Sequence, residues 1–408
     1  MEAPGKDLNR REFIKTTSAA TAGVMLTTSQ IAFGAEANEK LRLGLFGCGS
    51  RGPWIANFFE QHTNTKCVAV FDYFRDKVQA AGRRFDVGED MQFVGLDGYK
   101  EMLESDIDAV AVISPAYFHP EQAVAALEAG KHVYLAKPIA VDVPGCDAVV
   151  QAAKKHEKNL TTLVDFQTRV SEPYIEVAKA IHDGWIGDPV SGQAFFHGSR
   201  LAIRTKPGTD VAKLRNWFFE IPLAGDIIVE QSIHMIDVAN WFLQGHPEKA
   251  MGTGGRKARV DVGDSWDHFN VIYTYPNDVI IDFGASQFTK NYTDLTNRLF
   301  GTEGTVNASY GRDVWAKNRS GGPSGKTPQI YPGGAIANIK KFHESIMTGQ
   351  PINNTAVSAE STLAAILGRT AAYENRTVTW DEMLEKNERL DPQLDLPSDG
   401  PDTPVERV

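Results

Sequence analysis

Cysteine is scarce in this sequence, and no metal-binding motif is present. Three cysteines occur among the 408 residues, at Cys48, Cys67 and Cys146, and no two of them form a C-x-x-C pair. This spacing does not favour a zinc site, so we interpret all three as buried thiols. The sequence also lacks an H-E-x-x-H pattern, and His234 with Asp237 alone would supply too few ligands. We therefore predict no bound metal.

Basic charge and long apolar runs are also limited. The chain has 42 lysines and arginines against 52 acidic residues, which gives a formal charge of −10. Nucleic acids and anionic membranes both require a basic surface, so neither is an expected partner. After the first 37 residues no segment approaches the roughly 18 apolar residues of a membrane span. A small neutral ligand fits this composition better.

The first 37 residues have the pattern of an export signal. Asn9 to Lys15 read N-R-R-E-F-I-K, which resembles a twin-arginine motif, and an apolar stretch from Ala19 to Phe33 ends near the A-x-A triplet at 35–37. Substrates of the twin-arginine (Tat) machinery are exported already folded, so they need no disulfides. We expect a periplasmic or otherwise exported protein without a membrane span in its mature form. An accidental basic N-terminus is the alternative.

Residues 38–164 alternate between strand-like and helix-like segments. The apolar run Leu41–Phe46 leads into a glycine turn, Gly47–Gly52, and then into a helical pattern. A second strand, Lys66–Phe71, ends at Asp72. Further strands and helices follow at 109–113, 120–129, 132–135, 146–155 and 160–164. This α/β alternation predicts a Rossmann domain with a doubly wound parallel sheet.

Residues 165–390 have a different secondary-structure pattern, in which strand-like runs are interrupted by one strongly predicted helix. The strands are expected at 190–197, 271–275 and 279–288, and the helix at 231–242. This pattern predicts an α+β domain with a mostly antiparallel sheet. A surface loop at 320–332 and a helix at 335–347 follow, and residues 391–408 form an expected C-terminal tail, loosely packed at its end.

The glycine turn is the expected cofactor site. Backbone N–H groups and the helix dipole at a glycine-lined helix start attract a phosphate, and Gly47, Gly49 and Gly52 provide that start. Asp72 follows at the end of the second strand, where a carboxylate can bind ribose hydroxyls and repel a 2′-phosphate. NAD is therefore favoured. Arg75 keeps NADP open as an alternative.

Several motifs along the chain, in this order, resemble those of the Gfo/Idh/MocA oxidoreductases, which include glucose-fructose oxidoreductase and inositol dehydrogenase. The resemblance covers the chain after the first 37 residues. The matching motifs are the glycine turn, Ser114-Pro115 with His119, the segment 129–133 leading to Ala136-Lys137-Pro138, Phe166 to Arg169, Val229 to Asp237 followed by Trp241, and Phe300 to Gly304.

This resemblance implies a dinucleotide-binding domain and a second domain whose open sheet supports the substrate pocket and often an oligomer interface. The expected assembly is a homodimer or homotetramer. The expected activity transfers a hydride to or from a carbinol carbon of a sugar or polyol. The expected cofactor contacts are Gly47, Gly49, Ser50, Arg51, Gly52, Asp72, Ser114, Pro115, His119, Lys137 and Gln167.

Lys137, His234 and Glu230 are the expected catalytic residues. Hydride removal from a carbinol requires a proton acceptor, and a lysine near a cationic nicotinamide has a lowered pKa. Glu230 and His234 are four residues apart, so on one helix the carboxylate would orient the imidazole. Two positions depart from the family pattern: Ala136 replaces an acidic residue before Lys137, and Glu230 replaces an aspartate. Because of the first departure, the acidic side chain that would orient the lysine in the family is missing before Lys137.

The expected substrate contacts are hydrogen-bonding groups beside an aromatic face, which is what a sugar requires. Structural roles in the core or on the surface are equally open for each of them. These residues are Arg169, His197, Arg200, Trp217 and Asp237.

Two other functions stay open beside a carbohydrate oxidoreductase. Free NAD is scarce outside the cytoplasm, so an exported enzyme must hold its cofactor tightly and regenerate it in place. A redox-neutral glycoside hydrolase or lyase, resembling the family 109 glycoside hydrolases, would meet this condition through oxidation, elimination, hydration and reduction. A non-catalytic sugar- or nucleotide-binding protein is the second alternative, and the changes at Ala136 and Glu230 are the hints for it.

Overall fold

The computed structural model describes residues 40–401. The predicted export signal and the last part of the predicted tail, 402–408, lie outside the described residues. Within the described part, no helix combines the length and the apolar character needed to cross a membrane.

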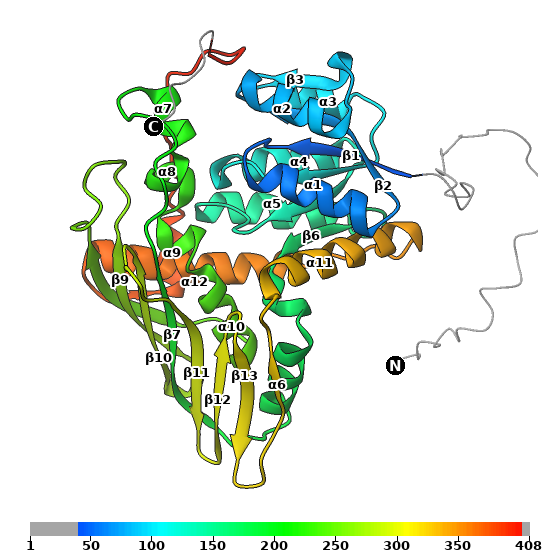
Figure 1. The fold of residues 1–408 in the computed structure, drawn as a ribbon. Helices are drawn as coiled ribbons and strands as arrows, with labels where there is room; N and C mark the ends of the chain where they lie inside the picture. Colours follow the sequence, from blue (N-terminus) through cyan, green and yellow to red (C-terminus); the bar gives the residue numbers. More distant parts are fainter. Residues whose placement is uncertain (1–39, 402–408) are drawn as a thin grey trace, which may run out of the picture. The chain divides into compact units, whose positions relative to one another are not determined.

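The first sheet is parallel and has six strands in the order β3-β2-β1-β4-β5-β6 (Figure 1). This is the strand order of a dinucleotide-binding fold and confirms the predicted doubly wound sheet. Helices cover both faces, so the strands read as continuous apolar runs; Ala109–Val112, for example, is buried throughout. The strands are β1 (Leu41–Phe46), β2 (Thr65–Asp72), β3 (Gln92–Val94), β4 (Ala109–Val112), β5 (His132–Ala136) and β6 (Thr162–Asp165).

Different sets of helices pack on the two faces of this sheet. One face packs against α1 (Arg51–His62), α2 (Arg75–Phe85) and α11 (Ile330–Met347), which share a buried cluster with β1. The other face packs against α3 (Gly98–Leu103), α4 (His119–Glu128) and α5 (Val143–His156). Helix α11 is therefore part of the first domain's core, although in sequence it follows strands β7 to β14 of the second sheet.

The second sheet has nine strands in the order β14-β13-β12-β11-β7-β10-β9-β8-β15. Only β7 and β10 pair in parallel, so the sheet is mostly antiparallel, as predicted. Buried and more exposed residues alternate along β9, which shows that one face packs on helices and the other does not. The strands are β7 (Pro189–Gly198), β8 (Lys249–Gly255), β9 (His268–Tyr275), β10 (Val279–Gln287), β11 (Asp294–Gly301), β12 (Gly304–Ser309), β13 (Asp313–Asn318), β14 (Ser324–Lys326) and β15 (Val378–Thr379).

The helices of the second domain connect the two sheets. The longest, α12 (Thr355–Glu374), contacts α5 of the first domain as well as α10 and β8. The remaining helices are α6 (Glu172–His182), α7 (Asp210–Arg215), α8 (Ile221–Ala224), α9 (Ile227–Glu230), α10 (Ile233–Leu243) and α13 (Trp380–Lys386), with 3₁₀ turns η3 (Gln167–Val170) and η4 (Trp217–Phe219) between them.

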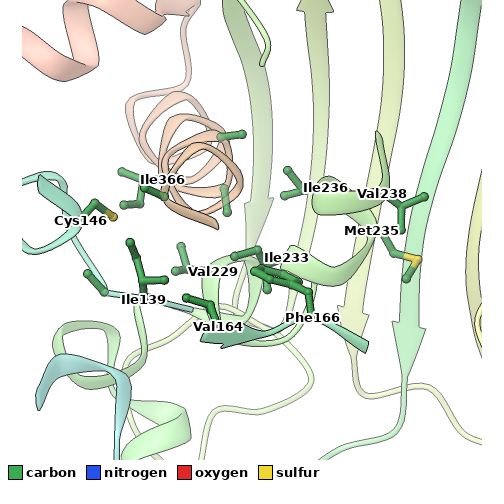
Figure 2. Close-up of a cluster of buried hydrophobic side chains, with 14 of the residues drawn as sticks. Ile139, Cys146, Val164, Phe166, Val229, Ile233, Met235, Ile236, Val238 and Ile366 are labelled. Atoms are coloured by element: carbon green, nitrogen blue, oxygen red, sulfur yellow. The ribbon is translucent and has the colours of Figure 1, made fainter. Parts of the chain in front are cut away.

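A continuous apolar cluster joins the two domains. Figure 2 shows Ile139 and Val164 of the first domain close to Val229 and Ile233 of the second, with Ile366 of α12 beside them. All five side chains are at most 2 % exposed. This packing fixes the loop after β5 and the segment α9–α10, which carry the predicted catalytic residues.

Two segments are more ordered than the sequence indicates. The expected surface loop at 320–332 contains β14 and the start of α11. The described part of the C-terminal tail is attached to the rest of the protein: Asp395 N donates to Asp210 Oδ2, and Leu96 N donates to Ser398 O. Pro- and Asp-rich composition indicates little regular structure, but it does not exclude packing through isolated leucines and backbone hydrogen bonds.

Candidate functional site

The three glycines of the turn between β1 and α1 have different surroundings. Gly47 has a φ of +89°, and a Cβ there would lie 2.7 Å from Ser114 N. A Cβ on Gly52 would collide with the carbonyl oxygen of Gly47, so this position allows α1 to approach the turn. Gly49 has open space around it, since a Cβ there would meet no atom within 4 Å. This arrangement leaves room for a diphosphate to approach the backbone at Gly49.

Asp72 is held at the end of β2 by two backbone N–H groups. Cys48 N donates to Oδ2 at 2.7 Å and Phe74 N donates to Oδ1 at 2.9 Å. Burial raises the pKa of this carboxyl, while the two N–H donors oppose that rise. The carboxylate lies on the wall of a cavity that begins at the glycine turn.

This cavity has a volume of about 550 Å³ and is lined by both domains. On the first domain it extends from the glycine turn past Asp72 to Ser114 and Pro115, and the second domain contributes the segment around η4. Arg75, the residue that kept NADP open, is exposed on α2. The basic side chains that line the cavity are Arg51, Lys77, Arg204 and Arg215. The glycine cradle and the oriented carboxylate fit a dinucleotide.

Lys137 follows β5 and is held by the second domain. Its Nζ donates to the backbone carbonyl of Glu230 and lies 3.3 Å from Glu230 Oε1. The two side chains are 14 % and 12 % exposed. Burial lowers the pKa of Lys137, the charge of Arg51 lowers it further, and Glu230 opposes both effects. In the family an acidic residue precedes the lysine, and Ala136 stands there in this chain. Glu230 therefore provides the carboxylate that contacts Lys137.

Glu230 and His234 do not share a continuous helix. The expected helix at 231–242 begins at Ile233 in the structure, and Glu230 is the last residue of α9. Gln231 and Ser232 separate the two helices, so the i to i+4 geometry does not apply. Glu230 consequently orients Lys137, and the predicted contact with His234 is replaced by this ion pair.

His234 lies between aromatic rings with one nitrogen free of protein partners. Its ring centroid is 6.2 Å from that of Phe166 and 5.8 Å from that of Tyr310. Nδ1 is buried and has no hydrogen-bond partner within the described structure. Burial lowers the pKa of this histidine well below its usual value, and the positive charges of Lys137 and Arg51 contribute. The imidazole is therefore neutral and can accept a hydrogen bond.

Arg51 of the glycine turn lies near Lys137 and His234, since its positive charge lowers the pKa of both. Its guanidinium donates to Asp165 Oδ2 at 2.6 Å and to the hydroxyl of Tyr331 at 2.9 Å. Asp165 also accepts from Gln167 Nε2 at 3.1 Å and from Asn338 Nδ2 at 2.8 Å. Four residues of this region were not predicted from the sequence: Asp165, Tyr310, Tyr331 and Asn338. Asp165 ends a strand at the ligand-binding edge of a parallel sheet, a signal that was available; the other three have no local signal.

Ser114 and His119 have internal partners. Ser114 Oγ donates to Gln122 Oε1 at 2.6 Å, and both residues line the cavity. The His119 ring nitrogens lie 2.7 Å from Pro138 O and 2.9 Å from Ser114 O. His119 therefore fastens the end of β4 to the segment that carries Lys137.

The predicted substrate residues are separated in the structure. Arg169 forms a two-pronged ion pair with the buried carboxylate of Asp237, with distances of 2.9–3.0 Å. Arg200 pairs with Asp261 near the surface. His197 lies 2.8 Å from Ser286 Oγ in a different hollow, on the second sheet. Trp217 lines the dinucleotide cavity.

Comparison with known protein families agrees with this geometry. Residues 41–163 match the family described as "Oxidoreductase family, NAD-binding Rossmann fold", and residues 174–307 match the "GFO/IDH/MocA C-terminal domain". The two matched regions together make up more than half of the chain. The protein belongs to the Gfo/Idh/MocA family. Its first domain is the NAD-binding domain of this oxidoreductase family.

Curated members of the family include inositol dehydrogenases. The chain is 28 % identical over 205 residues to an inositol 2-dehydrogenase of Salmonella paratyphi B, and this alignment covers 50 % of the chain and 54 % of that protein. The chain thus spans about half the length of this relative. A myo-inositol 2-dehydrogenase of Thermotoga maritima is 22 % identical over 356 residues, which cover 84 % of the chain and all of the relative.

Solved structures show the same fold. Levoglucosan dehydrogenase in complex with NADH and levoglucosan superposes with a TM-score of 0.68 at 19 % identity, covering 84 % of this chain and 99 % of that chain.

Within residues 40–401, no group of three or more histidine, cysteine or acidic side chains is arranged as a metal site.

Proposed function

We propose that this Gfo/Idh/MocA protein is an NAD-dependent oxidoreductase that transfers a hydride to or from a carbinol carbon of a sugar or polyol. One observation carries the proposal: Lys137, held by Glu230, and the buried His234 are both close enough to Arg51, which lines the cavity, for its charge to lower their pKa values. A lysine with a lowered pKa and a neutral imidazole thus lie near the residue that connects them to the cavity. This pairing is what carbinol oxidation requires.

The protein's own residues handle the proton. The nicotinamide of bound NAD supplies the hydride acceptor. In this proposal the substrate hydroxyl donates to Lys137 Nζ, whose position Glu230 fixes through its carbonyl and carboxylate oxygens. His234 accepts a hydrogen bond through its unpartnered Nδ1 and orients the same hydroxyl or its neighbour. The cation of Arg51, held by Asp165, favours the neutral forms of both groups.

The substrate class follows from the groups that surround His234. Tyr310 provides an aromatic face, and its hydroxyl donates weakly to Gln167 at 3.4 Å. Hydroxyl and amide groups beside an aromatic ring suit a neutral polyhydroxy ring. The compounds after which the relatives are named, inositols and levoglucosan, belong to this class.

We further propose that the cofactor stays bound and is recycled on the enzyme, because the predicted export signal would place the protein where free NAD is scarce. The test uses purified protein without added nucleotide. Mass analysis should find copurified NAD, and added inositols or free sugars should change the nicotinamide absorbance. Unchanged absorbance with every polyol would contradict the oxidoreductase. Release of nitrophenol from nitrophenyl glycosides would instead support the redox-neutral hydrolase.

Export through the Tat machinery is a separate proposal that rests on Arg10 and Arg11. An R10K/R11K double variant should remain in the cytoplasm, whereas the unaltered precursor should be processed and recovered outside it. Fractionation with antibody detection measures both. Equal export of the two proteins would contradict the proposal.

A further inference from the structure

The second domain contributes part of the wall of the cavity that holds the glycine turn. Beyond Asp72 its wall consists of Ala202 to Arg204 and of α7 and η4, which contribute Leu214, Trp217 and Phe218. In a fold of this strand order the carboxylate at the end of β2 faces the adenosine ribose. The part of the cavity next to Asp72 is therefore the adenosine end, and second-domain side chains cover it.

Trp217 and Phe218 form an aromatic surface in this part of the cavity. Their rings stack with centroids 3.9 Å apart and an interplanar angle of 26°. Tyr73 is 7 % exposed, and its buried hydroxyl has no hydrogen-bond partner within residues 40–401. Tyr73 also lines the cavity. An aromatic surface on the wall of this cavity suits a planar heterocycle, because a base can stack on it.

Arg215 attaches this cover to the loop that carries Asp72. Its guanidinium carbon lies 3.7 Å from the centroid of the Phe74 ring, and Nη2 donates to Asp76 Oδ1 at 2.9 Å. The Arg215 side chain is only 12 % exposed. Arg215 thus joins α7 to the segment after β2 through a cation–π contact and an ion pair.

The C-terminal segment 390–400 holds the cover from outside. Leu394 and Leu396 pack against a buried cluster that contains Tyr73, Phe74 and Leu214. Asp395 N donates to Asp210 Oδ2 at 3.0 Å, at the start of α7. The segment thus bridges α7 and the strand ends of the first domain, since Ser398 O accepts from Leu96 N.

We propose that the second domain forms an adenosine subsite, in which Trp217 stacks on the adenine of the bound dinucleotide and segment 390–400 keeps the subsite closed. Trp217 then serves the cofactor and not the sugar. The proposal rests on NAD binding by the first domain and is independent of the sugar that is oxidised. A closed subsite would also help to retain the cofactor, as proposed above.

The test measures nucleotide binding and not turnover. Nucleotide-stripped wild type and Trp217→Ala are titrated calorimetrically with NADH, ADP-ribose and nicotinamide mononucleotide. Stacking of one base on an aromatic side chain predicts a loss of about tenfold or more in affinity for NADH and ADP-ribose. Affinity for nicotinamide mononucleotide, which lacks adenosine, should stay within about twofold. Trp315→Ala, on the second sheet, is the matched control and should change none of the three.

Two further variants separate binding from folding. Arg204 is exposed and lines the cavity, so Arg204→Ala should fold normally and weaken ADP-ribose without affecting nicotinamide mononucleotide. The L394A/L396A double variant should release NADH several-fold faster in a chase experiment. ADP-ribose affinity that is unchanged in Trp217→Ala and Arg204→Ala would overturn the subsite. If wild type bound neither NADH nor ADP-ribose, the proposed oxidoreductase would fail instead.

Discussion

The glycines of the turn after β1 are needed for different reasons. Substitutions at Gly52 and Gly49 can therefore distinguish an effect on stability from an effect on NAD binding. A methyl group on Gly52 has no space, because it would meet the carbonyl oxygen of Gly47, whereas a methyl group on Gly49 meets nothing. We expect Gly52→Ala to lower the free energy of unfolding of the nucleotide-free protein by about 1–3 kcal/mol. Gly49→Ala should leave that stability unchanged and weaken NAD binding about tenfold, because its methyl occupies the diphosphate's approach.

Denaturant unfolding of the stripped protein and NAD titration check the two effects independently. A Gly49→Ala variant with wild-type affinity for NAD would show that the diphosphate does not pass this residue. Gly47 is not suitable for this comparison, because its positive φ would add backbone strain to any change in binding.

The ion pair between Glu230 and Lys137 predicts a pH effect with a definite sign. Glu230 raises the pKa of Lys137 against the lowering effects of burial and of Arg51. Removing the negative charge in Glu230→Gln should therefore lower that pKa further. If neutral Lys137 accepts the proton, the acidic limb of the kcat/KM profile should move to lower pH. Measured profiles of wild type and variant test this, and a limb that stays in place or moves upward contradicts it.

Lys137→Met tests whether Lys137 is the proton acceptor in polyol oxidation. It removes the amine and keeps most of the side-chain volume, and NAD titration and urea unfolding of the variant are measured beside the rate. The rate of polyol oxidation should fall by about 10²- to 10⁴-fold, the usual contribution of general acid–base catalysis. Single-turnover absorbance with bound NAD measures this rate directly. A rate near that of wild type would remove Lys137 from the proposed mechanism.

At the scale of elements, periodicity and motif order predicted both sheets but not the contacts between distant elements. The parallel sheet follows from local alternation, and the glycine turn from the residues between one strand and one helix. The break between α9 and α10 was not predicted, because the apolar pattern of 227–243 is continuous across it. The amphipathic pattern of α11 indicates an apolar face, but it does not tell which sheet that face covers.

The same reasoning applies to the candidate site. Lys137, His234 and the glycine turn belong to local motifs and were predicted. Tyr310 and Tyr331 act through neighbours that are distant in sequence, so a single sequence gives little indication of them, whereas the place of Asp165 at a strand end was a signal that the sequence offered. Trp217 shows the intermediate case: its aromatic character indicated ligand binding, and only the fold places it beside Asp72.

The connection between α8 and α9 contains a strained, buried carboxylate whose titration is testable. Asp226 has a φ of +73° and accepts from Tyr373 Oη, Trp266 N and Ile227 N. Burial raises its pKa from 3.8 to about 6. The folded state therefore favours the protonated form, and stability should fall as pH rises from about 4 through about 6. Asp226→Asn should show a smaller fall over this range, by at most about 3 kcal/mol.

Urea unfolding of both proteins across this pH range measures the difference. The carbonyl of asparagine can still accept from Tyr373, so the variant retains one of the buried hydrogen bonds. If the two proteins lost stability in parallel between these pH values, the carboxyl of Asp226 would not be the titrating group.

At the scale of the whole molecule, the shared core predicts that the two domains unfold together. The apolar cluster is continuous from the first sheet to the second, and Ile366 of α12 contacts it where the domains meet. Separate unfolding would expose this surface on both sides, at roughly 25 cal/mol per Å² of apolar area. Calorimetry should therefore show a single transition for residues 40–401, and saturating NAD should shift all of it, although the ligand contacts mainly the first domain. Ile366→Ala creates a cavity in the cluster. It should lower the midpoint temperature of that transition by an amount that corresponds to a loss of about 2–5 kcal/mol in the free energy of unfolding. Two transitions, of which NAD shifts only one, would show that the domains are energetically independent, and the positions of Lys137 and Glu230 would then depend on local contacts alone.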